Sequence, residues 1–368
     1  MKILYYFACE ESMMFEWQKM HIVDEMKHHN CEIEIFNPLL YRSLDEANDE
    51  VIKAAKEGKY DCFMSCHHGT VLYVETVKRI KEAGIPTLNF RPDNLVIPFF
   101  DKESAKHYDL VWITSKETEY LYKKWGCNTL FLPYAANPYA FQPVKSEHQI
   151  NKMVFVGNPH GSRIGMLNYL LNHEIPLTIH TKMTDTTHKF INASATDYAK
   201  ILVKNNLRYP IGIKLTAGSI IEKLGDHELL ISSKMLEMKE PIAICNMAKV
   251  YGEYALSLAF TDANSTGCLK KPVKIVNLRN FEIPMAGGLE ITSYCPEIAE
   301  YFENDKEIVL ANTQEELVDK ALFYLRPDME TIRNEMKENA RKRAENDHTW
   351  YNRFSKAFEK IGLKVLDY

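Results

Sequence analysis

Short apolar runs alternate with longer amphipathic stretches along almost the whole chain, and this alternation constrains the fold more than any other feature of the sequence. KILYYFA, CEIEIFN and YDCFMS each have the length and apolar content of a buried strand, and helix-like stretches separate them. The same pattern restarts after Lys152 with MVFVG. Strands separated by helices at this spacing are typical of parallel βαβ units. We therefore predict an α/β chain of two Rossmann-like, doubly wound domains that face each other across a cleft.

The length of 368 residues is more than one compact core usually holds, which favours two domains. Prolines and polar residues gather near Asn137–Asn151, where we place the linker. The predicted parts are an N-terminal domain over 1–145, a C-terminal domain over 146–345, and a C-terminal helix over 346–368 that packs back on the first domain. Two stretches of the second domain, residues 189–207 and 219–238, are predicted to be helical.

Charge, cysteine content and hydropathy exclude several classes of protein. The formal net charge of -5 leaves no basic surplus for nucleic acid. Eight cysteines without framework spacing indicate reduced thiols, and Cys62 and Cys66 with the two histidines after them lack a second pair at zinc-site spacing, so no metal site is predicted. The sequence has no signal-peptide pattern and no apolar run of ~20 residues, so we expect a cytoplasmic protein without a transmembrane segment. Peripheral contact with a membrane stays open.

The turn VFVGNPHGSR is the first candidate binding element. The apolar strand ends at Gly157, Asn158 begins a polar turn, and a helix is predicted from Arg163 onward. A helix N-terminus after such a turn presents unpaired backbone N–H groups and a positive dipole end, which together bind anions. Arg163 adds a planar, fork-shaped cation suited to a diphosphate. An ordinary βα turn with a solvent-exposed arginine is the alternative interpretation.

The second candidate element is NLRNFEIPMAGGLEITS. Glu282 lies at the start of a predicted short helix, which Gly287 and Gly288 end. A carboxylate at this place can accept hydrogen bonds from two ribose hydroxyl groups, and glycines allow the backbone to approach a ligand closely. A solvated glutamate followed by an ordinary glycine cap is the alternative.

These elements, in this order, resemble the CgeB-like (spore maturation protein type) glycosyltransferases, whose C-terminal half belongs to the GT-B group. The resemblance rests on VFVGN with Arg163 after it, RNFEIPMAGGLEIT, FENDKEIVLANTQEELVDKALFYL and DHTWYNR. In the first domain, YDLVWITSKETEYLYKKWG and LFLPYAANPYAF are similar to the same proteins, so the likeness covers most of the chain. It implies a GT-B glycosyltransferase of polysaccharide biosynthesis, which moves a sugar from UDP- or GDP-sugar to a glycan or other hydroxyl acceptor.

The resemblance also implies roles for individual residues. Glu282 would hold the ribose hydroxyls, while glycine-containing backbone and basic side chains would surround the diphosphate. Many retaining GT-B enzymes carry a further glutamate ahead of this one. Here that position is Lys274, which leaves the retaining or inverting outcome open. The predicted donor-side residues are Gly157, Asn158, Arg163, Lys249, Lys274, Arg279, Asn280, Phe281, Glu282, Gly287 and Gly288. For the lysines, a solvated side chain is the alternative.

The acceptor side is predicted in the first domain, at the carboxyl ends of its strands, where open α/β sheets bind ligands. An inverting transferase needs a carboxylate or imidazole within hydrogen-bond reach of the acceptor hydroxyl. His67 and His68 follow one strand and Asp93 follows another, so these three are the catalytic candidates. Glu10 and Glu11, after the first strand, rank behind them. At each position a structural or merely exposed side chain is the alternative.

No cofactor is expected beyond the nucleotide-sugar co-substrate. No Asp-x-Asp motif follows a strand in either half, which favours a metal-independent enzyme that stabilises the leaving diphosphate with helix dipoles and basic side chains. A dinucleotide oxidoreductase is disfavoured because G-x-G-x-x-G follows neither lead strand. Two alternatives stay open. One is a catalytically inactive GT-B-like binding or assembly protein, and the other is a different nucleotide-sugar enzyme, such as an epimerase.

Overall fold

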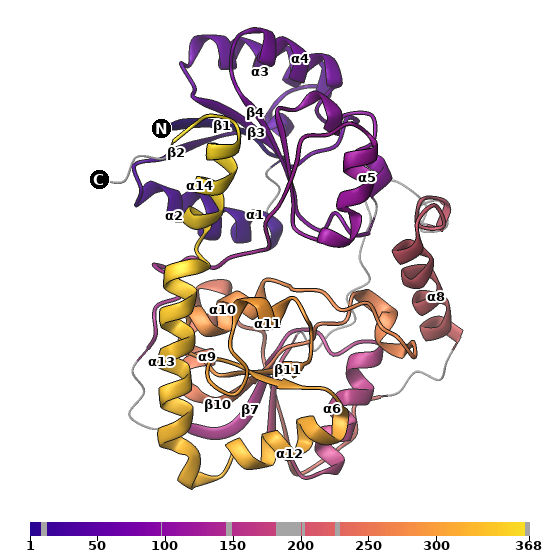
Figure 1. Ribbon diagram of the computed structural model, residues 1–368, viewed down its shortest axis with the longest axis vertical. Coiled ribbons are helices and arrows are strands. Elements are labelled where there is room, and N and C mark those ends of the chain that lie inside the picture. Colours follow the sequence, from indigo (N-terminus) through magenta and orange to yellow (C-terminus); the bar gives the residue numbers. More distant parts are fainter. Residues whose placement is uncertain are drawn as a thin grey trace. The chain divides into compact units, whose positions relative to one another are not determined.

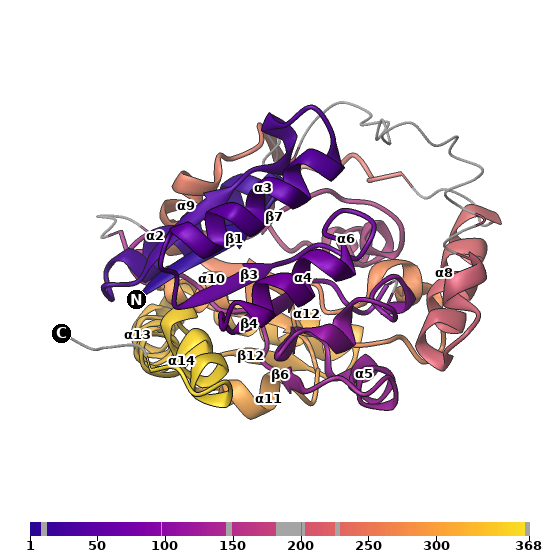
Figure 2. The same ribbon diagram turned by 90° about the horizontal axis from the view of Figure 1, so that it is seen from above.

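The computed structural model describes residues 1–8, 13–96, 98–144, 149–181, 200, 203–224 and 229–364. The chain divides into two compact units (Figures 1 and 2). Unit 1 consists of Met1–Asn137 with Thr349–Tyr368, and unit 2 of Pro138–His348. Each unit is built on a six-stranded sheet in which the described strands are all parallel. The α/β class with two doubly wound sheets, predicted from the alternation of strands and helices, is confirmed.

The sheet of unit 1 has the strand order β2-β1-β3-β4-β5-β6. Its elements are β1 Lys2–Tyr6, α1 Met13–Gln18, a π-helix Lys19–Val23, α2 Asp24–Lys27, β2 Glu32–Phe36, α3 Leu44–Glu57, β3 Cys62–Ser65, α4 Val74–Glu82, β4 Thr87–Arg91, β5 Leu110–Ile113, α5 Glu119–Lys124, β6 Thr129–Phe131 and α14 Trp350–Lys360. In β1 both the odd and the even residues are buried apart from its first, so helices must cover both faces of the sheet. Leu4 and Tyr6 pack with α3 and α4 on one of these faces.

Helix α14 belongs to unit 1 although it follows unit 2 in the sequence. Thr349 begins it with a capping box, in which the Thr349 side chain accepts from the Asn352 backbone N–H. Trp350 and Phe354 are fully buried and lie 5.9 and 5.2 Å, between ring centroids, from Trp112 of β5. The aromatic contacts explain why the last helix completes the core of the first unit.

The sheet of unit 2 has the order β12-β11-β10-β7-β8-β9. Its elements are β7 Ile150–Val156, α6 Ser162–Asn172, β8 Leu177–His180, α8 Pro210–Leu224, β9 Leu236–Lys239, α9 Met247–Glu253, β10 Tyr254–Leu258, a 3-10 helix η7 Asn264–Cys268, α10 Arg279–Met285, β11 Glu290–Ser293, α11 Ile298–Tyr301, β12 Val309–Ala311, α12 Gln314–Tyr324 and α13 Glu330–Asp347. Apolar residues of β7, β8, β10 and β11 form one core with α6 and α12. Helix α10 packs on α9 and α13.

The predicted helix over 219–238 is wrong at its C-terminal end, where Leu236–Lys239 forms the edge strand β9. The sequence LEMK alternates apolar and charged residues, and the strand pairs with β8 in parallel. Glu237 accepts from Lys152 at 3.0 Å, which ties the edge strand to β7. Tertiary pairing therefore overrides the helical propensity of this stretch. Most of the predicted helix over 189–207 lies outside the described residues.

Helix α8 lies at the periphery of unit 2, away from its sheet, in both views (Figures 1 and 2). It packs against η7, and the backbones approach so closely that a Cβ on Gly218 would lie 2.6 Å from the Ser265 oxygen. Only glycine permits this approach. Within the described ranges, no helix combines the length and the apolarity that a membrane span needs.

Candidate functional site

The strand order of unit 2 reverses between β7 and β10, and in open α/β sheets such a reversal gives a crevice at the carboxyl ends of the two strands. From β7 the chain proceeds to β8 and β9 on one side, and then to β10, β11 and β12 on the other. In open α/β sheets, ligands bind outside the carboxyl ends of the strands where the order reverses in this way. Gly157 follows β7 and Phe260 follows β10, and the rings of Phe155 and Phe260 meet edge to face at 5.1 Å. The predicted VFVGN turn thus lies at the topological switch point of its sheet.

Arg163 lies in the first turn of α6, beside this crevice. Its guanidinium carbon lies 5.5 Å from the centre of the Phe260 ring, which orients the side chain by a cation–π contact. Nη1 of Arg163 donates to the backbone oxygen of Asn158 at 3.4 Å, a long hydrogen bond. Within the described residues, this is the only hydrogen bond of the guanidinium. Most of its donors are therefore available for a ligand.

Electrostatics at Arg163 favour an incoming anion. Burial lowers the pKa of Arg163, the Asp262 and Glu222 carboxylates oppose this, and the nearby Arg279 guanidinium adds to it. The net direction is downward, so the carboxylates do not fully compensate the buried positive charge. The first turn of α6, with Gly161 as its N-cap, contributes the positive end of a helix dipole next to the same side chain.

Two ion pairs lie near Arg163 and form a charged cluster with it. Asp262, four residues past the end of β10, binds the Lys274 ammonium at 2.6 Å. In the first turn of α10, Arg279 forms an ion pair with Glu282. Burial opposes the charge of Arg279, but the Glu282 carboxylate and Tyr251 together outweigh this effect and raise the pKa of Arg279. Arg163, Lys274 and Arg279 thus face three carboxylates, those of Glu222, Asp262 and Glu282.

The two members of the Arg279–Glu282 pair differ in accessibility. The Glu282 side chain is 1% exposed, whereas that of Arg279 is 29% exposed. A ribose hydroxyl can therefore reach the Glu282 carboxylate only when the Arg279 side chain turns away from it. In the structure as it stands, Glu282 holds the guanidinium that faces the crevice.

A chain of hydrogen bonds fixes the start of α10. The Asn277 side chain donates to the backbone oxygen of Phe260 at 2.7 Å, and the Asn277 backbone N–H donates to the Asn280 side-chain oxygen at 2.8 Å. The Asn280 amide in turn donates to Glu290 of β11. Burial raises the pKa of Glu290 to about 8, although the bond from Asn280 acts in the opposite direction. The predicted residue Asn280 is thus part of the scaffold beneath the charged cluster.

Other predicted donor-side residues lie away from the crevice. Phe281 is fully buried and packs its ring on that of His348 at 5.2 Å. Lys249 is 62% exposed and pairs with Glu253 at 3.7 Å.

Gly287 and Gly288 stand between the end of α10 and the start of β11. Since β11 and β10 are parallel, this turn lies at the amino edge of the sheet, opposite to the edge that carries Gly157. Gly287 has φ +69° and a Cβ on Gly288 would lie 2.9 Å from the Tyr251 oxygen, so backbone geometry and close packing account for both glycines. The structure does not bring them together with Arg163.

Sequence reasoning missed two carboxylates of the cluster, those of Asp262 and Glu222. Asp262 follows the strand YALSLAF, so its place at a carboxyl strand end was a usable signal. Glu222 lies near the end of α8 and is brought to the α6 turn by the packing of α8 on η7. No local motif in the sequence marks this approach.

In unit 1, the predicted histidines lie at the equivalent switch point, between β1 and β3. Nε2 of His67 accepts from the Ala8 backbone N–H at 2.9 Å, which joins the two strand ends. Burial lowers the pKa of His67 to about 3, helped by Arg91. A neutral imidazole with its accepting nitrogen occupied is a weak general base. His68 has Nδ1 2.7 Å from the Thr70 hydroxyl, and burial lowers its pKa as well.

Asp93 follows β4 and has an exposed side chain. Its carboxylate accepts from the Tyr134 hydroxyl at 2.7 Å, which fixes the carboxylate at the carboxyl edge of the sheet. Burial, together with the Asp93 charge, holds the pKa of Tyr134 far above its usual range, so this phenol remains a donor. Glu10 and Glu11 lie outside the described residues. Among the residues that are described, no group of three or more His, Cys, Asp or Glu side chains is arranged to hold a metal ion.

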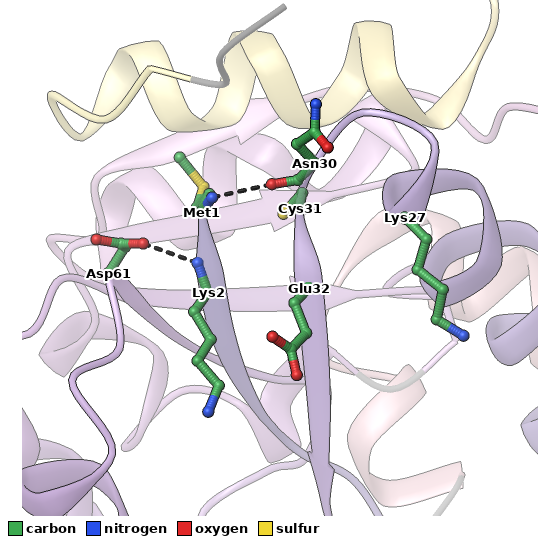
Figure 3. A pocket seen from close by; sticks show the side chains of 7 residues that line it. All are labelled: Met1, Lys2, Lys27, Asn30, Cys31, Glu32 and Asp61. Atoms are coloured by element: carbon green, nitrogen blue, oxygen red, sulfur yellow. Dashed lines mark hydrogen bonds between the residues drawn. The ribbon is translucent and has the colours of Figure 1, made fainter. Parts of the chain in front are cut away.

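A surface pocket of unit 1 lies at the opposite, amino edge of its sheet (Figure 3). The Met1 ammonium donates to the Asn30 oxygen at 3.0 Å, and the Lys2 backbone N–H donates to Asp61 at 2.7 Å. The lining residues are Met1, Lys2, Lys27, Asn30, Cys31, Glu32 and Asp61. The predicted site residues are absent from this lining, and the pocket has no part in the proposed chemistry.

Comparison with known proteins gives a consistent picture of the fold. Residues 222–359 match the model of a family described as Glycosyl transferase-like. No curated protein sequence matches the chain. HepE from Anabaena in complex with UDP-glucose is 12% identical, covers 98% of this chain and 99% of that chain, and has a TM-score of 0.59. A glycosyltransferase from Rickettsia africae is 10% identical, with 97% of each chain covered and a TM-score of 0.57.

Sucrose-phosphate synthase from Thermosynechococcus elongatus is also similar, at 11% identity, with 98% of this chain and 99% of that chain covered and a TM-score of 0.54. At such identities the likeness shows the fold, which is the GT-B arrangement of two Rossmann-like units, as predicted. The predicted cleft between the units stays a prediction.

Proposed function

We propose that the protein is a glycosyltransferase that moves a sugar from a nucleotide-sugar to a hydroxyl acceptor. The GT-B fold and the family match over 222–359, a range that contains Arg279 and Glu282, support this proposal. The observation that carries it is the under-compensated guanidinium of Arg163 beside the N-terminus of α6, at the switch point of its sheet. That arrangement suits the diphosphate of a UDP- or GDP-sugar.

In the proposed donor complex, Arg163 and Arg279 bind the diphosphate oxygens. Both are guanidinium groups with donors in a planar fork, and Arg279 already has the more exposed position of its ion pair. As Arg279 turns toward the phosphates, the Glu282 carboxylate becomes accessible to the ribose hydroxyls. Lys274, held by Asp262, adds a further cation at the same edge.

The proposed reaction breaks the bond between the anomeric carbon of the sugar and the diphosphate oxygen, and forms a bond from that carbon to the acceptor oxygen. The nucleoside diphosphate leaves with the electron pair of the broken bond, and the acceptor proton passes to a base. Preorganised cations and the α6 dipole stabilise the departing charge. We infer from this cationic cluster that the reaction is independent of metal, in which case EDTA leaves the rate unchanged.

On the acceptor side, we propose Asp93 as the base, ahead of His67 and His68. Its carboxylate is exposed at the carboxyl edge of the unit 1 sheet and is oriented by Tyr134. In the His67 imidazole, by contrast, the accepting nitrogen already accepts a hydrogen bond from the Ala8 backbone N–H. Asp93→Asn should abolish transfer while nucleotide binding in unit 2 persists. Transfer at the wild-type rate would exclude Asp93.

The decisive experiment combines a thermal-shift screen with a product assay. Unfolding is monitored with UDP, GDP, CDP and their sugars, because a ligand of the folded state raises the apparent stability. Stabilisation by a nucleotide-sugar, together with a glycosylated acceptor and free nucleoside diphosphate, is expected. Binding without turnover on any glycan would indicate a binding protein instead. Conversion of the sugar without transfer would indicate an epimerase, and no shift with any nucleotide would overturn the proposal.

Three finer assignments belong to the same proposal. We place the protein in the CgeB-like group, in the cytoplasm and in polysaccharide biosynthesis, on the motifs that it shares with that group, among them VFVGN and RNFEIPMAGGLEIT. A glycan acceptor in the product assay tests the last of these directly.

A further inference from the structure

Helix α8 carries a concentration of exposed apolar side chains. Ile213, Ile220 and Ile221 are each about half exposed, and Leu224 is 83% exposed. Val203, just before the helix, is exposed as well. Proteins that stay free in solution rarely leave a contiguous apolar patch of this kind, so it marks a surface that binds something.

The exposed residues share one face of the helix, opposite to the face that packs on η7. Ile213, Ile220 and Leu224 recur at helical spacing and form a stripe, with Ile221 beside it. The buried residues of α8 are Gly212, Leu215, Thr216 and Gly218. A Cβ on Gly218 would meet Ser265 and Thr266 of η7, whereas one on Gly212 would meet Asn206. The stripe therefore contributes nothing to the core of unit 2.

Lysines flank the stripe on both sides. At ~100° per residue, Lys214 lies to one side of Ile213 and Lys223 lies to the other. Both side chains are exposed. Residues 203–224 contain four basic residues, Lys204, Arg208, Lys214 and Lys223, and one acidic residue, Glu222, although the chain as a whole has a net charge of -5. Two of these basic residues, Lys214 and Lys223, belong to α8 and flank the apolar stripe.

We propose that α8 docks the protein on an anionic lipid surface, lying in the plane of the interface. The stripe enters the boundary between headgroups and acyl chains, while Lys214 and Lys223 extend sideways to the phosphates and cover the edges with their methylene groups. Such a helix has an apolar face bordered by basic residues and does not span the bilayer. This proposal does not depend on the proposed transferase activity.

Charge argues against a second copy of the chain as the occupant. Pairing two α8 stripes face to face would bring the flanking lysines of one copy against those of the other, and like charges in contact are destabilising. A planar anionic surface, in contrast, neutralises both flanks at once.

The test is co-sedimentation of the full-length protein with vesicles of phosphatidylcholine alone and of phosphatidylcholine with phosphatidylglycerol in equal parts. We expect binding to the anionic vesicles that weakens as salt is added, and little binding to the neutral ones. Lys214→Gln with Lys223→Gln should weaken binding by about fivefold for each lysine. Ile220→Ser with Leu224→Ser should weaken it by at least about tenfold, because the apolar insertion is lost.

Leu322→Ser with Ile332→Ser is the matched control, since both residues are exposed and apolar but lie on other helices of unit 2. Thermal unfolding checks that each variant is folded. The proposal is overturned if the protein does not bind anionic vesicles or binds neutral and anionic vesicles equally. It is also overturned if the lysine and isoleucine–leucine variants of α8 bind anionic vesicles as tightly as the control variant does. A dimer in solution that the Ile220→Ser, Leu224→Ser variant dissociates would overturn it in favour of a second copy.

Discussion

The guanidinium of Arg163 rests on the ring of Phe260, with 5.5 Å between the guanidinium carbon and the ring centre. Arg163 follows β7 and Phe260 follows β10, so this contact joins the two strands at which the order of the unit 2 sheet reverses. The contact positions the Arg163 guanidinium by means of an aromatic ring and not by means of a hydrogen-bonded carboxylate. The charge therefore stays available to an anionic ligand.

Replacing Arg163 by methionine should weaken nucleotide binding without harming the fold. Methionine keeps the contact with Phe260, while the loss of charge-assisted hydrogen bonds should weaken UDP or GDP binding by about tenfold or more. Because burial already lowers the pKa of Arg163, the ligand-free variant should unfold at or above the wild-type temperature. Arg326→Met, at an exposed arginine paired with Asp328, is the control. Unchanged nucleotide titrations for Arg163→Met would contradict the assignment.

The Arg279–Glu282 pair should be strongly coupled in stability. Either Glu282→Ala or Arg279→Ala leaves a poorly exposed charge without its partner and should lower the free energy of unfolding by about 3 kcal/mol. The double variant should lose much less than the sum of the two. Urea unfolding of all four proteins gives the coupling energy. The exposed Arg326–Asp328 pair, treated in the same way, should give much weaker coupling because solvent screens it, and equal coupling in the two cycles would refute the prediction.

Glu25 should make the stability of unit 1 depend on pH. Its carboxylate is buried and accepts from the Tyr351 backbone N–H at 2.7 Å, at the start of α14. Burial raises the pKa of Glu25 from 4.5 to about 8, against the opposing backbone hydrogen bonds and Arg353. The folded state thus holds a proton that the unfolded state releases. The stability that this proton confers is complete below pH 4.5 and is lost as the pH rises to about 8.

Glu25→Gln mimics the protonated carboxyl group and should remove this dependence. Relative to wild type, the variant should gain a few kcal/mol in free energy of unfolding between about pH 4.5 and 8. Unfolding by urea at a series of pH values measures the difference. Glu359→Gln, at an exposed glutamate of α14, should leave the wild-type profile intact. A constant difference between Glu25→Gln and wild type at every pH would show that Glu25 is ionised in the fold.

Gly288→Ala should reduce stability but leave nucleotide affinity unchanged. An added Cβ would lie 2.9 Å from the Tyr251 oxygen and 3.1 Å from the Ile283 oxygen, so overpacking should cost about 1–3 kcal/mol. The turn is at the amino edge of the sheet, away from Arg163. Gly252→Ala, in helix α9 and with 3.5 Å to its nearest neighbour, is the control and should be close to neutral. A loss of nucleotide affinity in the folded Gly288→Ala protein would show that this turn belongs to the donor site after all.

Local patterns in the sequence were sufficient for the elements that carry the site. The run MVFVG and the helix after it predict the β7–α6 turn, and a helix ended by Gly287 predicts α10. The sequence order also predicts where the turn of Gly287 and Gly288 lies. The turn comes between a helix and the next strand, and the start of a parallel strand lies at the amino edge of its sheet. Assigning Gly287 and Gly288 to the diphosphate overlooked this consequence.

The rest of the site depends on contacts between segments far apart in the sequence. Asp262 acts on Arg163, which is about a hundred residues earlier in the chain, and Glu222 reaches the same side chain from α8. Edge strand β9 is short and polar, and only its pairing with β8 identifies it. The place of Asp262 after a strand and the alternation in LEMK are local signals, but neither indicates the contact partner, which only the tertiary structure supplies.

The return of α14 to unit 1 has a consequence for synthesis on the ribosome. Unit 2 is one continuous stretch, Pro138–His348, and the aromatic core of unit 1 lacks Trp350 and Phe354 until this stretch has been synthesised. Synthesis of unit 1 therefore begins before that of unit 2 and is completed after it. Until α14 has been synthesised, the apolar surface around Trp112 stays exposed to solvent. Nascent chains stalled before Thr349 should therefore be substrates for chaperones or proteases.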